Sequence, residues 1–397
     1  MKILFLDQTG KLAGAEQVLL DVAYPYRHTS LVALFEGGPF EQALRDRNIP
    51  VEVLTDDPLD VRRESSLWQG LSSLKQLTPL VQRVVQLSQH YDIIYANTPK
   101  AMVVGALAHL LTHTPLVYHL HDILSLEHFS QANRQLLVTL ANRCATRIIA
   151  VSHATKKAFV EAGGKGDRVD VIYNGFDVDK FRGWELEGFF LRRQLNLDHQ
   201  FVVGHFSRLS PWKGQHVLIE ALPRCPQNMV VLLVGDALFG ETDYAERLRR
   251  QVTALKLEDR VHFLGFRGDV PQLMATCDLI THTSTAPEPS ARVLIESMLS
   301  GRPLVASHTG GTSELVDDGY TGWLVPPADA GALASTLTQL HDRPVQTAQI
   351  AKQGQQVAQA RFGLDGAISA LQLILNTLAP DRRQTTEVGS RKSEVRI

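Results

Sequence analysis

The sequence predicts an α/β protein with two doubly wound domains. Short, continuous apolar runs alternate with helix-length amphipathic segments along most of the chain, and this rhythm occurs twice. Continuous apolar runs divided by helices are typical of parallel strands that are covered on both faces of their sheet. A chain of 397 residues is also long for one domain and suits two domains of ordinary size.

The first half contains six predicted strands, with helical patterns between several of them. The runs are KILFLD, LVALFE, PVEVL, DIIYAN, LVYHLHD and RIIAVS, at residues 2–7, 31–36, 50–54, 92–97, 116–122 and 147–152. Together with the helices between them, they predict a first domain over residues 1–172.

The second half repeats the pattern after an interruption at residues 173–198, the predicted linker. Its runs are FVVGHFS, MVVLLVGD, VHFLGF, DLITHTS, PLVASH and GWLVP, at residues 201–207, 229–236, 261–266, 278–284, 303–308 and 322–326. They predict a second domain over residues 173–360. A helical pattern at about 361–380 is predicted to pack back on the first domain. Residues 381–397 are polar and lack periodicity, which predicts a disordered tail.

Charge and composition exclude several function classes. The formal net charge is −2, so no strong field attracts nucleic acid or an anionic membrane. Cys144, Cys225 and Cys277 are odd in number and widely spaced, which argues against a disulfide framework or a zinc site. The apolar residues before Asp7 are too few for a signal peptide, and no apolar stretch has the length of a membrane span. We therefore expect a cytoplasmic protein that binds no nucleic acid and contacts a membrane at most peripherally.

Two acids in the segment APEPSARVLIESMLSG are candidates for ligand binding. Glu288 and Glu296 are eight residues apart, which corresponds to ~12 Å along a helix. The segment from Pro289 to Gly301 has the start and stop signals of a helix. Carboxylates accept hydrogen bonds from paired hydroxyls, so two at this separation suit the two ends of a nucleotide sugar. The spacing alone favours the alternative, in which Glu296 is a solvated helix residue.

Cations and glycines follow other strands of the second domain, where ligands of open parallel sheets bind. Arg208 and Lys213 follow the run at 201–207 and suit a diphosphate, Arg as a planar fork and Lys as a point charge. Gly310 and Gly311 precede a short helix, where glycines allow close backbone approach and the helix N-terminus favours anionic oxygens. The alternatives are solvated loop charges and a plain turn.

As a set, these motifs resemble the retaining GT-B glycosyltransferases of family 4, the glycosyl transferases group 1. The motifs GHFSRLSPWKG, VGD, VHFLGF, PEPSARVLIESMLSGRPLVAS, GGTSELV and GYTGWLVPPAD occur in the order and spacing of that family. The resemblance is strong from Val171 to Asp329 and looser over the first half. It implies the GT-B fold, in which two Rossmann-like domains face a central cleft, and the transfer of a sugar from a nucleotide donor.

The resemblance also implies a role for each charged candidate. Arg208 and Lys213 resemble the pair that holds the diphosphate and stabilises it as it departs. Glu296 resembles the acid that binds the ribose, and Glu288 resembles the acid beside the donor sugar.

The backbone around the first of these acids departs from the family pattern. Pro289-Ser290-Ala291 stands where the commoner sequence is Pro-Phe-Gly, which leaves the identity of the donor sugar open. Backbone amides at Ser290, Ala291 and Arg292 remain available to contact donor hydroxyls or phosphate.

The first half matches the family in smaller places. In LAGAEQVLLDVA, Gly14 resembles the glycine of the loop that approaches the donor phosphate, although Ala13 replaces its usual glycine partner. In YHLHD, His121 and Asp122 resemble a His-Asp pair near the transferred sugar, whereas His119 is expected to be structural. The catalytic candidates are therefore His121, Glu288, Arg208 and Lys213.

The resemblance implies a reaction that retains the anomeric configuration, in which the leaving phosphate helps to deprotonate the acceptor. No metal or other cofactor is expected if Arg208 and Lys213 hold the phosphate, and Asp177 and Asp179 in the linker are expected to be structural. Uridine diphosphate sugars are the expected donors, and the acceptor is an unidentified glycan, lipid or small molecule. The alternatives are a sugar-nucleotide epimerase of the same architecture and a non-catalytic nucleotide-sugar-binding protein. A nicotinamide dehydrogenase is disfavoured because no G-x-G-x-x-G follows the first strand.

Overall fold

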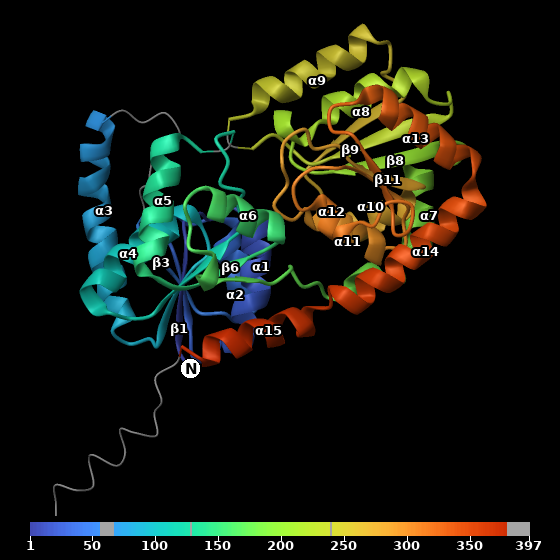
Figure 1. Cartoon of the computed structure of the whole chain (residues 1–397). Helices are drawn as coiled ribbons and strands as arrows, with labels where there is room; N and C mark the ends of the chain where they lie inside the picture. The colour runs from blue at the N-terminus through green and yellow to red at the C-terminus, as the bar shows by residue number, and fades with distance from the viewer. Residues whose placement is uncertain (56–66, 128, 239, 379–397) are drawn as a thin grey trace, which may run out of the picture.

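The computed structural model describes residues 1–55, 67–127, 129–238 and 240–378, with the backbone alone at residues 67–77. Within these residues the chain forms two parallel β-sheets, each with helices on both faces (Figure 1). The predicted α/β class with two doubly wound domains is confirmed, and all twelve predicted strands are present. The predicted tail, residues 381–397, lies outside the described residues.

The first sheet has, within the described residues, seven strands in the order β3-β2-β1-β4-β5-β6-β7, all parallel. The strands are β1 (Ile3–Asp7), β2 (Leu31–Leu34), β3 (Val51–Val53), β4 (Ile93–Ala96), β5 (Leu116–Leu120), β6 (Ala145–Ala150) and β7 (Val169–Val171). The helices are α1 (Gly14–Ala23), α2 (Pro39–Asp46), α3 (Leu67–Ser88), α4 (Pro99–Thr112), α5 (Gln131–Cys144) and α6 (His153–Glu161). Strand β7 is not among the predicted strands, because VDV is short and polar at Asp170.

The second sheet has, within the described part of the chain, six parallel strands in the order β10-β9-β8-β11-β12-β13. The strands are β8 (Phe201–Phe206), β9 (Met229–Val234), β10 (Val261–Gly265), β11 (Leu279–His282), β12 (Leu304–Ser307) and β13 (Trp323–Val325). The helices are α8 (Gln215–Ala221), α9 (Thr242–Ala254), α10 (Val270–Thr276), α11 (Arg292–Leu299), α12 (Thr312–Leu315), α13 (Ala330–Asp342) and α14 (Pro344–Arg361).

Each sheet separates two hydrophobic clusters, which is why its strands read as continuous apolar runs. Successive strand residues point to opposite faces, so Leu4 and Leu6 join one cluster while Ile3 and Phe5 join the other. In the second sheet, alternate residues of β8 and β9 divide between the two faces in the same way.

The predicted linker is more structured than expected. It contains a 3₁₀ turn, Val178–Phe181, and helix α7, Glu185–Gln194, which packs on α10. The close approach is made at Gly188, where an added Cβ would lie 2.7 Å from the Cβ of Ala275. The linker from residue 185 onward is therefore packed on the elements of the second sheet.

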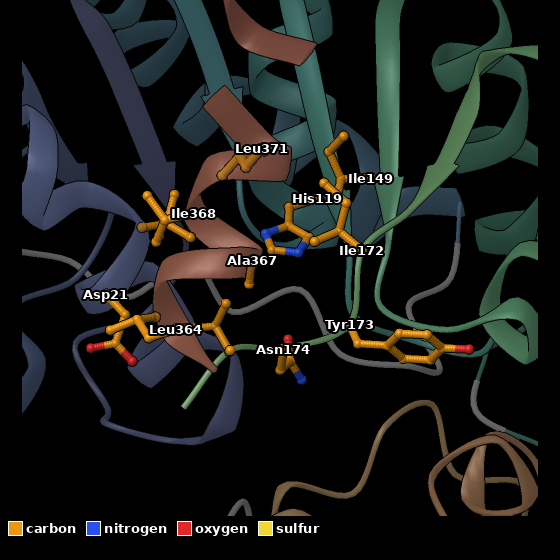
Figure 2. Close-up of a pocket in the computed structure, with 13 residues that line it drawn as sticks. Asp21, His119, Ile149, Ile172, Tyr173, Asn174, Leu364, Ala367, Ile368 and Leu371 are labelled. Atoms are coloured by element: carbon orange, nitrogen blue, oxygen red, sulfur yellow. The ribbon is translucent and has the colours of Figure 1, made fainter. Parts of the chain in front are cut away.

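Helix α15, Leu364–Asn376, returns to the first sheet after α14 (Figure 1). Its Leu371 and Leu375 belong to the same hydrophobic cluster as Ile3 and Phe5. The chain crosses between the sheets at Gly175, where an added Cβ would lie 2.8 Å from the Cβ of Ala367. Figure 2 shows the pocket beside this crossing; its lining includes His119, Asn174 and residues of α15, but none of the predicted site residues.

The strand orders place one switch point in each sheet, where successive crossovers leave in opposite directions. In the first sheet it lies between β1 and β4, and in the second between β8 and β11. Crevices for ligands form at the carboxyl ends of the strands that flank a switch point. Of the residues described next, Arg208 follows β8 and Glu288 lies in the loop after β11, so both come from a switch point. His121 follows β5 and Gly310 follows β12, each the strand next to a switch point.

Candidate functional site

Arg208 and Lys213 lie after β8, on a turn built around Trp212. The Cζ of Arg208 lies 5.6 Å, and the Nζ of Lys213 4.0 Å, from the centre of the Trp212 ring. The turn is held by Thr283, whose hydroxyl donates to the carbonyls of Lys213 (3.1 Å) and Gly214 (2.8 Å). The two predicted cations are thus brought together, with an aromatic ring contacting both.

Lys213 is joined to Glu288, so two predicted catalytic residues are in direct contact. The Nζ of Lys213 donates to Oε1 of Glu288 at 2.5 Å, and the carboxylate is 2% exposed. Burial alone would raise the pKa of Glu288, but the charge of Lys213 and hydrogen bonds from Lys213 and His282 outweigh burial and hold that pKa well below its usual range. Burial lowers the pKa of Lys213, while Glu288 opposes that shift. The structure therefore presents an ionised carboxylate bonded to Lys213, which in turn lies within electrostatic range of Arg208.

Gly310 and Gly311 pack on the backbone that carries Glu288. Gly310 has φ +59°, in the left-handed region, and an added Cβ would overlap the backbone of Glu288. The amide of Gly311 donates to the carbonyl of Glu288 at 2.7 Å. The glycine pair thus fixes the position of Glu288.

The predicted helix from Pro289 begins later than expected. Helix α11 starts at Arg292, after an N-cap at Ala291 that offers no side-chain hydrogen bond. Glu288 therefore precedes the helix. The expected separation of ~12 Å between Glu288 and Glu296 assumed that all eight residues are helical, and this assumption is wrong. Ser290 lies in the loop and accepts a 3.4 Å hydrogen bond from the side chain of Asn174.

Glu296 lies one turn inside α11 and is paired with Arg292. The Nε of Arg292 is 3.5 Å from Oε1 of Glu296, and both side chains are 16% exposed. Burial raises the pKa of Glu296, and Arg292 opposes that shift. The guanidinium also lies over Phe176, with its Cζ 4.4 Å from the ring centre.

His121 lies after β5 in the first domain and is oriented by Asn97, not by Asp122. Its Nε2 donates to Oδ1 of Asn97 at 2.9 Å, and the amide of Asn97 donates to Asp7 at 2.7 Å. Burial, with smaller contributions from His119 and Arg292, lowers the pKa of His121 well below its usual range. His121 is therefore neutral, with its proton on Nε2. Its neighbour His119 is paired with the Tyr95 hydroxyl at 2.8 Å, in keeping with a structural role.

The two domains bring their candidates close together. Gly14 is the first residue of α1, and an added Cβ there would lie 3.6 Å from Cδ of Arg292. Burial raises the pKa of Asp122 to about 6, and the charge of Arg208 opposes this shift. Candidates of the first domain thus lie close to cations of the second. Gly14 and His121 lie near Arg292, and Asp122 lies near Arg208.

Glu314 on α12 connects the two domains directly. Its carboxylate accepts hydrogen bonds from the amides of His153 (2.7 Å) and Ala154 (2.6 Å), at the N-terminus of α6. It also accepts a 2.9 Å bond from the Tyr173 hydroxyl, whose pKa is raised to about 12 by burial and by Glu314. A carboxylate at a helix N-terminus is stabilised by the unpaired amides and the helix dipole. Glu314 therefore bonds α12 of the second domain to the N-terminus of α6 in the first domain.

Replacing Glu314 by Ala is expected to loosen the contact between the domains, because the three hydrogen bonds that its carboxylate accepts are lost. Small-angle scattering should show a larger radius of gyration for the unliganded variant than for the wild type. The control is Glu246→Ala, an exposed carboxylate on α9. A radius of gyration equal to that of the wild type would contradict this role of Glu314 in the contact between the domains.

Several functional candidates were not predicted from the sequence: Asp7, Asn97, Trp212, His282, Ser284 and Glu314. Asp7, Asn97 and His282 do carry a usable signal, since each ends or directly follows a strand beside a switch point. Glu314 does not, because its partners come from distant segments of the chain. Trp212 and Ser284 contact residues within four positions of themselves, but a loop sequence does not show which of these neighbours their side chains meet.

Metal ligands were also considered in the described parts of the chain. There, no three His, Cys, Asp or Glu side chains gather closely enough to hold a metal ion. In the predicted linker, Asp177 accepts a hydrogen bond from the amide of Asp179 at 3.3 Å and caps the 3₁₀ turn. No described helix combines the length and apolar character that crossing a bilayer requires.

Comparison with known proteins gives consistent matches over most of the chain. A sequence profile described as glycosyl transferases group 1 matches residues 189–357, and one described as glycosyltransferase family 4 matches residues 40–180. The UDP-Gal:alpha-D-GlcNAc-diphosphoundecaprenol alpha-1,3-galactosyltransferase of Escherichia coli is 25% identical over 309 residues, covering 75% of this chain and 78% of that protein.

Solved structures share both the fold and, in one case, much of the sequence. Sucrose-phosphate synthase of Thermosynechococcus elongatus is 20% identical with a TM-score of 0.80, over 95% of this chain and 98% of that one, and shares the fold. HepE of Anabaena, crystallised in complex with UDP-glucose, is 51% identical with a TM-score of 0.89, over 95% of this chain and 100% of that chain. With this likeness and the two profile matches, the chain belongs to the group 1 glycosyltransferases and has the GT-B fold.

Proposed function

We propose that this protein transfers a sugar from a UDP-linked donor to a hydroxyl of a glycan, lipid or small-molecule acceptor, with retention of configuration and without a metal ion. The observation that carries the proposal is the contact of Lys213 with Glu288. Arg208 lies within electrostatic range of this Lys213 and also of Asp122 in the first domain. A UDP sugar is the proposed donor because HepE, 51% identical to this chain, was crystallised with UDP-glucose.

The donor would be held along the carboxyl edge of the second sheet. Arg208 and Lys213 bind the diphosphate, and Lys213 has three N–H donors, so it can bind phosphate while it remains bonded to Glu288. Glu296 binds the ribose hydroxyls. The remaining contacts come from backbone amides at Gly14, Ser290, Ala291 and Arg292, with Gly310 and Gly311 holding the Glu288 segment in place.

The reaction would proceed on one face of the sugar. The bond from the anomeric carbon to the diphosphate breaks, and UDP leaves with the bonding electrons while Arg208 and Lys213 stabilise its charge. The acceptor oxygen attacks from the same face and passes its proton to the departing phosphate. His121 is neutral with its proton directed to Asn97, so its Nδ1 is available to accept a hydrogen bond from a donor or acceptor hydroxyl.

The test is to incubate the purified protein with UDP-glucose and a panel of glycan, lipid-linked and small hydroxyl acceptors, and to determine the anomeric configuration of the product by NMR. A product with the configuration of the donor, formed equally in excess chelator, supports the proposal. An inverted product contradicts the retaining mechanism, and activity lost to the chelator contradicts metal independence. Conversion of the UDP sugar with no acceptor present would favour the epimerase.

A further inference from the structure

His282 and Ser284 form a donor pair beneath Glu288. His282 is the last residue of β11, and Ser284 is two residues further on, so the alternation of an extended chain turns both side chains to the same side. Both are buried, with exposed fractions of 1% and 0%. The Nε2 of His282 donates to Oε1 of Glu288 at 2.9 Å, and the hydroxyl of Ser284 donates to the same oxygen at 2.5 Å.

Lys213 adds a third donor to the same atom. Its Nζ donates to Oε1 at 2.5 Å, so among the described residues all three hydrogen bonds to this carboxylate end on Oε1. Oε2 is the oxygen left to accept a bond from a ligand. A carboxylate with one oxygen saturated by the protein can offer the other in a single orientation, which suits recognition of one sugar hydroxyl.

The protonation of His282 is consistent with this arrangement. Burial lowers the pKa of His282, so the ring is neutral and carries one proton. Its Nδ1 is buried without a hydrogen-bond partner, whereas Nε2 faces Glu288. The proton therefore belongs on Nε2, where it satisfies the carboxylate.

We propose that His282, assisted by Ser284, is a positioning residue that saturates Oε1 of Glu288 and thereby directs Oε2 to a hydroxyl of the donor sugar. The proposal rests on the proposed function of this site as a UDP-sugar site. It predicts that His282 affects recognition of the sugar and leaves recognition of UDP almost untouched. Among the described residues the hydrogen bonds of His282 go to Glu288 and Ser284, and Lys213 keeps its own bond to Oε1 when His282 is replaced.

The experiment compares His282→Leu with His282→Gln, since the Gln amide reaches about as far as Nε2 and can still donate. Calorimetry measures the dissociation constants of UDP and of UDP-glucose for each variant. His282→Leu is expected to weaken UDP-glucose roughly tenfold relative to UDP, the value of one hydrogen bond to a charged group. His282→Gln is expected to recover most of this difference, and where turnover is measurable, kcat/KM should follow the same order.

The proposal would be overturned if the ratio of the UDP-glucose and UDP dissociation constants were the same in the wild type, His282→Leu and His282→Gln. It would also be overturned if both variants lost the same affinity for UDP-glucose. If His282→Leu does not fold, His282→Asn replaces it, because its shorter amide cannot reach Oε1. The binding ratios need no turnover, so a wild type that binds UDP-glucose but transfers nothing would contradict the proposed function and still test this inference.

Discussion

Replacing Lys213 by Met is expected to lower kcat/KM by about 10²–10³-fold, the range measured when one pre-organised donor to a developing negative charge is removed. In the proposed reaction Lys213 binds the departing diphosphate, and contacts with Trp212 and Glu288 already fix its position before any ligand binds. A pre-positioned charge requires little reorganisation in the transition state. Steady-state kinetics with the best donor and acceptor measure the loss, and calorimetry with UDP shows how much of it is binding.

The same substitution should also reduce stability, because Glu288 is 2% exposed and loses its cationic partner. Removing one member of a buried ion pair costs about 3–5 kcal/mol of unfolding free energy, and the hydrogen bonds from His282 and Ser284 should keep the loss at the lower end. In the double variant Lys213→Met/Glu288→Gln the uncompensated charge is gone, so stability should recover while activity does not.

Lys157→Met provides the matched control, since Lys157 is 77% exposed and its ion pair with Glu161 is 3.9 Å long. It should leave both kinetics and unfolding unchanged. A Lys213→Met protein that keeps near wild-type kcat/KM would contradict the assignment of Lys213 to the diphosphate. If the double variant regains stability but not activity, the activity loss of Lys213→Met does not come from its lower stability, and the catalytic role is separate from the structural one.

The fold could be predicted because its signal is local and repeated. In β1, each of Ile3, Leu4, Phe5 and Leu6 is fully buried between two layers of helices, and such a strand must be apolar at every position. Where this condition fails, so does the prediction: VDV in β7 alternates, and α7 lies in a segment that breaks the apolar rhythm. The start of α11 was placed too early because a proline and a polar run can precede a helix as well as begin it.

The candidate site could be predicted only in part. Residues that closely follow strands, such as Arg208 and His121, are found by position, since parallel strands end at one edge of a sheet. Glu288 is found from its spacing to Glu296 beside a helical pattern. Their partners are not found in this way. Asn97, rather than the adjacent Asp122, bonds to His121, and it follows another strand, 24 residues earlier in the chain. Which polar groups meet depends on the order of the strands in the sheet and on the geometry of the crossovers. The local pattern of apolar and polar residues does not determine either of them. The glycine pair illustrates this, because Gly310 packs on the backbone of Glu288.

Replacing Glu288 by Gln is expected to reduce kcat/KM by about 10²-fold while the dissociation constant of UDP stays within about threefold of the wild-type value. Gln has nearly the same shape, and its carbonyl oxygen can still accept the bonds from Lys213, His282 and Ser284. Its amide nitrogen then takes the place of Oε2, where it can donate but not accept. The hydroxyl of the donor sugar then has no oxygen of residue 288 to which it can donate a hydrogen bond, and the site loses a negative charge. The proposed contacts to the diphosphate remain.

This pair of measurements separates an enzyme from a binding protein of the same fold. An enzyme should lose turnover and keep UDP binding, whereas a non-catalytic nucleotide-sugar binder has no turnover to lose. Glu220→Gln, at an exposed position on α8, controls for the loss of one negative charge. If Glu288→Gln turns over at the wild-type rate, the ionised carboxylate is not required in the transition state. The low pKa that Lys213 and His282 impose on Glu288 would then be only a consequence of holding a buried acid in place.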